Sequence, residues 1–240
     1  MRALFITLSA LAIAGCDGSI ELGGDGLANG QPLDALELEA FDSVSLRGPD
    51  NVEITLGEAY DIRIEGDPDV VERLEFEIRR DTLRIGRDRG NGIGIGDEAA
   101  TVFITLPVLN GASISGSGDM RIERAESERF EASIAGSGSM AIAALEAEQA
   151  EFDIAGSGDI EAAGTVADLE IGIAGSGDVE AEELRVERAE VDIAGSGNVE
   201  IFATGEVNGS LIGSGDIRVR GGAECRSNSI GSGEMRCSDT

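Results

Sequence analysis

The chain has 240 residues and a formal net charge of -29, with 47 Asp and Glu residues against 18 basic ones, all of them arginine. This balance excludes nucleic acids and anionic membrane surfaces as electrostatic partners, because both select a basic face. Histidine and lysine are absent, which excludes histidine-based catalysis, histidine metal sites and lysine Schiff bases.

Residues 1–15 have the pattern of a secretory signal peptide, with Arg2 before an apolar segment that is too short to span a membrane. The segment ends in small residues before Cys16 and resembles the bacterial lipobox. The resemblance implies cleavage before Cys16, lipidation of that residue, and an exported protein anchored to a membrane of the cell envelope, in the periplasm or at the cell surface. An ordinary signal peptide with a chance cysteine remains the alternative.

Residues 16–32 are rich in glycine and predict a flexible tether. Residues 33–110 predict irregular β coils. Within them, residues 70–74 form either one helical turn or an extended edge, Arg80 and Asp81 form the turn of a hairpin, and residues 87–99 form a surface loop. The expected strands are Phe41–Leu46, Val52–Leu56, Tyr60–Ile64, Glu75–Ile78, Leu83–Ile85 and Val102–Pro107.

Residues 111–240 contain a repeat of about 20 residues, marked by the tripeptide Gly-Ser-Gly. Apolar and polar residues alternate on both sides of each tripeptide, which is typical of strands with one buried face. A single repeat cannot bury its apolar face alone, whereas stacked repeats bury a continuous core. The sequence therefore predicts an all-β, single-domain parallel β-helix, which we expect to be right-handed, with coils of 18–20 residues. Glycines form the repeat corners at Gly116, Gly136, Gly156, Gly175, Gly195, Gly213 and Gly231.

The order of strands and turns, followed by serial Ser-Gly-Ser-Gly-Asp, resembles one family over roughly residues 33–235. This is the auto-transporter adhesin head GIN domain family. The resemblance implies a β-helix fold and a secreted or envelope-anchored bacterial protein with an adhesin-like role, and it carries over no active-site residues. The chain departs from the pattern at Ser139 and Asn198, where the acidic turn residue is missing.

The last repeat differs from the others. Its inward positions before the turn are Ser227 and Ser229, which are polar, as expected of a terminal coil that caps the core. Once Cys16 is set aside, Cys225 and Cys237 are an even pair in an exported protein, and we expect a disulfide between them. Two free thiols remain the alternative.

No catalytic residue stands out, because every coil carries carboxylates and no pair is distinguished. Asp159, Asp178 and Asp216 fall at one corner and predict a ladder of like charges, which calcium could relieve, although solvation and salt could suffice. No other cofactor is indicated. Aromatic residues are scarce, and Phe103, Phe130 and Phe152 fall at positions that we interpret as core.

We therefore predict a non-enzymatic, lipid-anchored envelope protein with a structural or interaction-mediating role that includes adhesion. Its expected partners are the membrane through the lipid, and an unidentified envelope protein or glycan. The alternative is an extracellular glycan-binding or glycan-processing β-helix, which a cleft with converging carboxylates and an arginine would favour. A third option is an oligomerising module whose exposed strand edges or ends pair.

Overall fold

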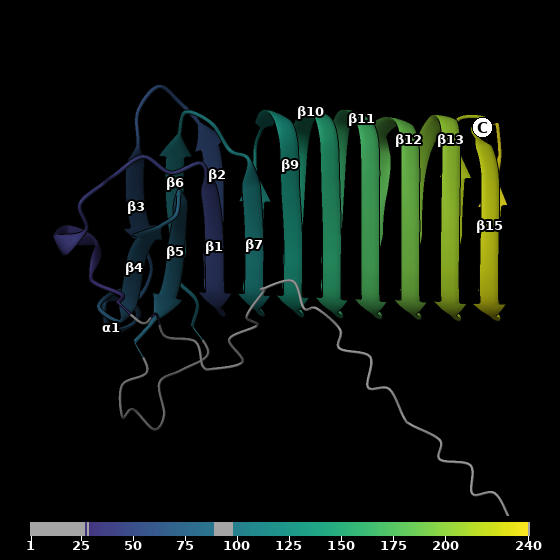
Figure 1. Cartoon of the computed structure of the whole chain (residues 1–240). Helices are drawn as coiled ribbons and strands as arrows, with labels where there is room; N and C mark the ends of the chain where they lie inside the picture. Colours follow the sequence, from purple (N-terminus) through teal and green to yellow (C-terminus); the bar gives the residue numbers. More distant parts are fainter. Residues whose placement is uncertain (1–26, 28, 89–97, 240) are drawn as a thin grey trace, which may run out of the picture.

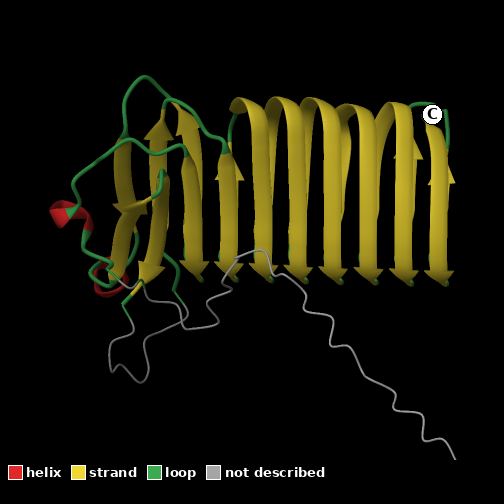
Figure 2. Ribbon diagram, viewed as in Figure 1, coloured by secondary structure: helices red, strands yellow, loops and turns green. Residues whose placement is uncertain are grey.

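The computed structural model describes residues 27, 29–88 and 98–239. The predicted signal peptide, Cys16 and most of the predicted tether and surface loop lie outside the described residues. Strands make up 68% of the structure and helices 3%, in a single β-solenoid domain. The predicted all-β fold is confirmed, and Figures 1 and 2 show its coils as a row of parallel strands. Among the described residues, no helix is long and apolar enough to cross a membrane.

The regular part of the solenoid has two faces. Face A contains β8 and the first segments of β10 to β13, and face B contains β7 and their last segments; the chain turns between the faces without leaving strand geometry. The expected short strands are therefore joined into continuous strands of up to 18 residues. Their bounds are β7 Gly111–Gly116, β8 Met120–Ile122, β9 Ala125–Gly136, β10 Ser139–Gly156, β11 Asp159–Gly175, β12 Val179–Gly195, β13 Val199–Gly213, β14 Ile217–Arg220, β15 Glu224–Gly231 and β16 Met235–Cys237.

The N-terminal coils are not stacked in chain order. On face B, β1 lies between β5 and β7, and on face A, β2 lies between β6 and β8. The antiparallel strands β3 and β4 then close this end by pairing with β6 and β5. The bounds are η1 Leu33–Ala35, β1 Ser43–Gly48, β2 Asn51–Leu56, β3 Asp61–Glu65, α1 Pro68–Val71, β4 Leu74–Arg79, β5 Thr82–Arg87 and β6 Thr101–Leu106.

Parallel, in-register pairing places equivalent residues of successive coils side by side. One buried row on face B continues through six coils, each side chain at most 3% exposed: Ile114, Ile134, Ile154, Ile173, Ile193 and Leu211. Branched apolar side chains suit this position because they pack well on a pleated surface. The hydrophobic core is thus a continuous column of such rows between the two faces.

The repeat corners need glycine for two reasons. The first glycine of each Gly-Ser-Gly has φ between +134° and +145°, a region that side chains with a Cβ rarely adopt. A Cβ at Gly156 would also lie 2.2 Å from the carbonyl oxygen of Gly136 in the preceding coil. Close stacking of backbone on backbone at this corner therefore requires that every coil keep its glycine.

Three further details refine the sequence-based expectations. The predicted hairpin is present between β4 and β5, with Arg80 and Asp81 at φ +51° and +61°. The interpretation of Phe103 as a core residue was wrong: Phe103 is half-exposed and lies under the guanidinium of Arg63, 5.6 Å from its ring centroid. Within the predicted tether, Gln31 forms a β-bridge with Phe76.

A buried ion pair, which the sequence did not reveal, joins the first coils. Asp50 is fully buried and accepts hydrogen bonds from Arg87 Nε (2.7 Å), Arg87 Nη2 (2.6 Å) and the Ala100 N–H (2.9 Å). Arg87 Nη2 also donates to the Glu98 carbonyl (2.9 Å). The hydrogen bond to Asp50 raises the pKa of Arg87. Asp50 thereby ties β1–β2 to both ends of the segment that connects β5 with β6.

The last coil is held by a disulfide and buries little apolar surface, with Cys225 and Met235 only partly buried against the core. Cys225 on β15 and Cys237 on β16 are joined by a bond of 1.98 Å, which links face B to face A. The serines at the expected inward positions, Ser227 and Ser229, are exposed at this end of the solenoid. The coil beneath is nevertheless sealed, with Leu211 only 2% exposed.

Candidate functional site: an acidic groove and the carboxylate ladders

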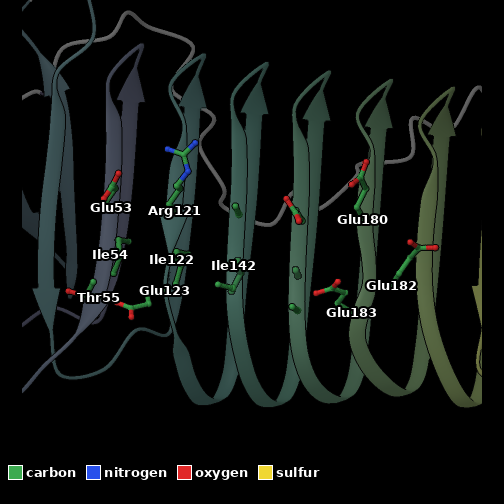
Figure 3. A pocket seen from close by; sticks show the side chains of 15 residues that line it. Glu53, Ile54, Thr55, Arg121, Ile122, Glu123, Ile142, Glu180, Glu182 and Glu183 are labelled. Carbon is green, nitrogen blue, oxygen red and sulfur yellow. The ribbon is translucent and has the colours of Figure 1, made fainter.

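A groove of about 660 Å³ runs across face A, over β2, β8, β10, β11 and β12. Its floor is formed by the strands themselves at residues such as Ile54, Ile122 and Ile142, whose side chains are buried in the core. Successive side chains of a strand point to opposite faces. The residues before and after each isoleucine in its own strand therefore point outward and form the walls of the groove. Figure 3 shows these wall residues projecting from neighbouring coils.

The groove walls are strongly acidic. Six glutamates and one arginine line the groove: Glu53, Glu123, Glu161, Glu180, Glu182, Glu183 and Arg121. Pairing of the strands places Glu53 beside Arg121, and Glu161 beside Glu180. Within the described residues, no carboxylate oxygen lies within 4.0 Å of the Arg121 guanidinium. The groove therefore offers one cationic donor among several acceptors.

An aromatic side chain stacked on an arginine lies beside each end of the groove. Phe103, under Arg63, pairs with Glu53 at the N-terminal end. At the other end the Arg185 guanidinium lies 4.9 Å from the ring centroid of half-exposed Phe202. Beside Phe202, Arg220 Nη2 forms an ion pair with Glu182 of the groove at 2.8 Å. Polar walls with aromatic ends are features that polyhydroxylated or cationic ligands can use.

Face B carries a second acidic ladder, in which Glu131, Glu151, Glu170 and Glu190 stand in register on four adjacent coils. Arg129 is the nearest cation to two of them, 3.8 Å from Glu131 and 3.9 Å from Glu151. Burial raises the pKa of Asp153, and the neighbouring glutamates, Glu151 foremost, raise it further. The negative charges on this face therefore outnumber the arginines that could neutralise them.

The corner carboxylates considered for calcium have partners within the protein. Asp159 Oδ1 accepts a hydrogen bond from the backbone N–H of Asp178 (3.0 Å), and Asp178 Oδ1 accepts one from the N–H of Asn198 (2.7 Å). Asp216 Oδ1 accepts from the N–H of Glu234 (3.1 Å). These bonds stabilise the charges without a metal, and the described residues contain no group of three or more His, Cys, Asp or Glu side chains placed to hold a metal ion.

One exception shows what the corner residue does. Ser139 has no carboxylate, and the N–H of Asp159 above it instead donates to the Gly138 carbonyl at 3.3 Å. Asn198 keeps the ladder intact, since its Oδ1 accepts from the N–H of Asp216 (3.2 Å). The Asp or Asn at the corner thus joins one coil to the next.

Sequence reasoning found the corner glycines and the corner carboxylates but missed the groove. Its residues come from β2 and from four later coils, so no local motif marks them. A signal did exist in Arg121, because the next four coils have Ala141, Glu161, Glu180 and Glu200 at the same repeat position. The outward placement of Phe103 could also have been noticed from its alternation with buried Val102 and Ile104.

Comparison with known proteins agrees with this architecture. A family model described as "Putative auto-transporter adhesin, head GIN domain" matches residues 40–223. A search of curated proteins finds no match.

Several solved structures share the fold. A putative adhesin from Bacteroides fragilis has a TM-score of 0.79 at 22% identity, over 85% of this chain and 94% of that chain. A putative lipid binding protein from Parabacteroides distasonis has a TM-score of 0.67 at 23% identity, over 85% and 95%. A putative adhesin from Parabacteroides merdae has a TM-score of 0.67 at 19% identity, over 85% and 94%.

Each of those crystallised chains is matched over almost its whole length. The family match covers well over half of the present chain and includes every coil up to β14. The chain therefore belongs to the auto-transporter adhesin head GIN domain family.

Proposed function

We propose that this chain is a non-enzymatic cell-envelope lipoprotein, anchored through Cys16, whose solenoid acts as an adhesin-like interaction domain. The observation that carries the proposal is the in-register array of charged side chains that the family fold displays on two rigid faces. Such an array offers many equivalent contacts and no distinguished reactive group. The adhesin-like names of the family and of the B. fragilis structure support the same role.

The anchor is tested on the full-length chain in a bacterial host fed with an alkyne fatty acid. We expect labelling and membrane fractionation of the wild type, and loss of both in Cys16→Ser. The matched control is Cys225→Ser, which removes a cysteine far from the lipobox and should leave labelling unchanged. Equal labelling of wild type and Cys16→Ser would rule out lipidation at this residue.

The adhesive role is tested with the chain lacking residues 1–26, applied to glycan arrays and immobilised envelope fractions with and without calcium. We expect saturable binding to at least one envelope component, weakened by salt because the faces are acidic. Binding that needs calcium would support the calcium expectation for Asp159, Asp178 and Asp216. Absence of binding under every condition would contradict adhesion and leave a scaffolding role.

The groove supports a second candidate function, recognition of a glycan. It combines Arg121 with several carboxylates, and Phe103 lies beside it, which is the arrangement that favours a glycan-binding β-helix. Glycan binding should then be lost in Arg121→Ala and retained in Arg124→Ala, which removes an exposed arginine outside the groove. Calorimetry with neutral and amino-sugar oligosaccharides distinguishes hydrogen bonding from charge attraction.

A further inference from the structure

The two ends of the solenoid are closed differently. At the N-terminal end, β3 and β4 run antiparallel to the coil beneath them, and Gln31 pairs with Phe76 on the outer side of β4. At the C-terminal end, β15 pairs with β13 and β16 pairs with β14, and no described residue pairs with the outer edge of either strand. Figure 1 shows β15 as the last strand of the row, opposite the end formed by β3 and β4.

The open edge of β15 presents backbone donors and acceptors. Ser232 donates its N–H to Gly213 of the preceding coil at 2.8 Å. Because N–H groups along a strand alternate between its two edges, those of Ser227, Ser229 and Gly231 point away from β13. An unpaired strand edge of this kind is a ready template for another strand.

The side chains of the last coil do little to block such pairing. Natural edge strands use proline and charged side chains to prevent association. Neither β15 nor β16 contains proline, and residues 227–231 of β15 carry no charged side chain. Ile230 on β15 is 66% exposed and Ile212 in the coil beneath it is 57% exposed, the two highest values among the large apolar side chains described as exposed. The disulfide between β15 and β16 holds both edges at a fixed separation.

Charge also distinguishes this end. The chain as a whole carries -29, whereas residues 221–240 contain three acidic residues and two arginines, a balance of 2 − 3 = −1. Arg226 and Arg236 lie within 4.0 Å of Glu224 and Glu234 of the same strand or turn, which neutralises them locally. Two copies of so acidic a protein repel one another least when they approach through this coil.

We infer that the C-terminal coil is a self-association surface, where two copies of this chain meet end to end about a twofold axis. β15 pairs antiparallel with β15 of the second copy, and β16 pairs with its own equivalent. The rotation axis runs through both sheets, so each face continues into the same face of the partner. The assembly stops at two copies because the N-terminal ends are capped and cannot pair further. It does not depend on the lipid anchor or on any ligand.

The test is sedimentation equilibrium of the chain lacking residues 1–26, which keeps every residue of the described core, from about 1 μM to about 500 μM, a range suited to a small interface. We expect the mass to rise from monomer to dimer. Small-angle scattering should give a dimer of about twice the monomer length, as coaxial stacking requires. A monomer at every concentration, or a side-by-side dimer, would overturn the proposal, and so would a dimer that forms only with an added envelope protein.

Matched variants locate the surface. Ser229→Pro removes one N–H of the open edge and leaves the bonds to β13, whereas Ser229→Ala shortens the same side chain and keeps the N–H. We expect Ser229→Pro to raise the dimer dissociation constant about tenfold or more and Ser229→Ala to leave it nearly unchanged. An equal dimer in both variants would contradict edge pairing.

Two measurements keep the test decisive if Ser229→Pro fails to fold. Ile230→Lys places a charge beside the edge without altering the backbone and should also weaken the dimer. Amide hydrogen exchange of the wild type should show protection at Ser227 and Ser229 that grows with protein concentration. Concentration-independent exchange at both amides, in a sample that does dimerise, would place the interface elsewhere.

Discussion

Asp50 has partners that lie 37 and 50 residues away in the chain. Breaking a buried pair leaves an uncompensated charge, which typically costs about 3–5 kcal/mol. We expect Asp50→Asn to lower the free energy of unfolding by that amount in urea titrations. Asp61→Asn is the control, because the Asp61–Arg63 pair is largely exposed and its loss should cost less than about 1 kcal/mol. Equal effects of the two variants would show that Asp50 does not join the first coils.

Asp153 makes stability depend on pH. Burial and the nearby Glu151 and Glu170 raise its pKa above the ordinary value. A carboxyl with a raised folded-state pKa binds its proton more tightly in the folded state than in the unfolded state. The ionised form of Asp153 therefore destabilises the folded protein, and this loss of stability is fully present at neutral pH. The penalty is relieved as pH falls through the raised pKa.

We therefore expect Asp153→Asn to stabilise the protein at about pH 7, by up to about 0.5 kcal/mol as for other surface changes, and to reduce the gain in stability on mild acidification. Urea midpoints measured from about pH 7 down to about pH 4.5 check both effects. Ser133→Asn, in the neighbouring coil of the same outward row, is the uncharged control. A steeper gain on acidification in Asp153→Asn than in the wild type would reverse the assigned sign.

At the scale of the coil, the corner glycine is the element's least replaceable residue. Gly156→Ala places a Cβ at φ +138° and 2.2 Å from a backbone oxygen, so strain and overpacking should together cost about 2–5 kcal/mol. Gly172→Ala, in the next strand β11, meets only the flexible carboxylate of Asp153 and should cost less than about 1 kcal/mol. Thermal unfolding compares the two. Similar losses would mean that corner geometry is not what requires glycine.

The last coil should depend on its disulfide. The bond closes a loop of 12 residues in sequence separation, for which the chain-entropy model gives about 3 kcal/mol. We expect Cys237→Ser to increase proteolysis and hydrogen exchange within β15 and β16 while β10 to β12 keep their protection. Reduction of the wild type should reproduce the effect and leave Cys237→Ser unchanged. Uniform loss of protection along the chain would show that the coil is not a separate cap.

The repeat allowed the regular coils to be predicted closely, because alternation and glycine spacing are local properties of the sequence. Ile154 and its equivalents face the core as the alternation indicates, and Gly156 forms a corner. Phe103 was misplaced because aromatic character was given more weight than its alternation with Val102 and Ile104. The groove could not be predicted, since it depends on which outward residues of separate coils come into register.

For the whole molecule, the stacking order of the first coils was also beyond sequence reasoning. β5 and β6 follow β1 and β2 in the chain yet lie on their outer side. Long-range contacts specify this order, among them the Asp50–Arg87 pair and the register of the four strands. A pattern that repeats about every 20 residues predicts that coils adjacent in sequence stack on each other. It does not predict the position of a coil that stacks in a different order from the chain.

The net charge of -29 should make stability depend on salt. Self-repulsion among carboxylates is screened as ionic strength rises, so we expect the unfolding temperature to increase by several degrees between about 20 mM and about 500 mM NaCl. Calcium and magnesium chlorides at equal ionic strength should give equal shifts if screening alone acts. A larger shift with calcium would instead indicate a specific site at the corner carboxylates.

Because the coils stack in register, the length of this molecule can change only in steps of one whole coil. Each coil adds about 4.8 Å to the axis and presents the same backbone edge to the next coil that it received from the one before. A recombination event that duplicates or deletes one repeat in the gene would therefore lengthen or shorten the rod by one fixed step. Both ends would keep their shape, and only the distance between them would change.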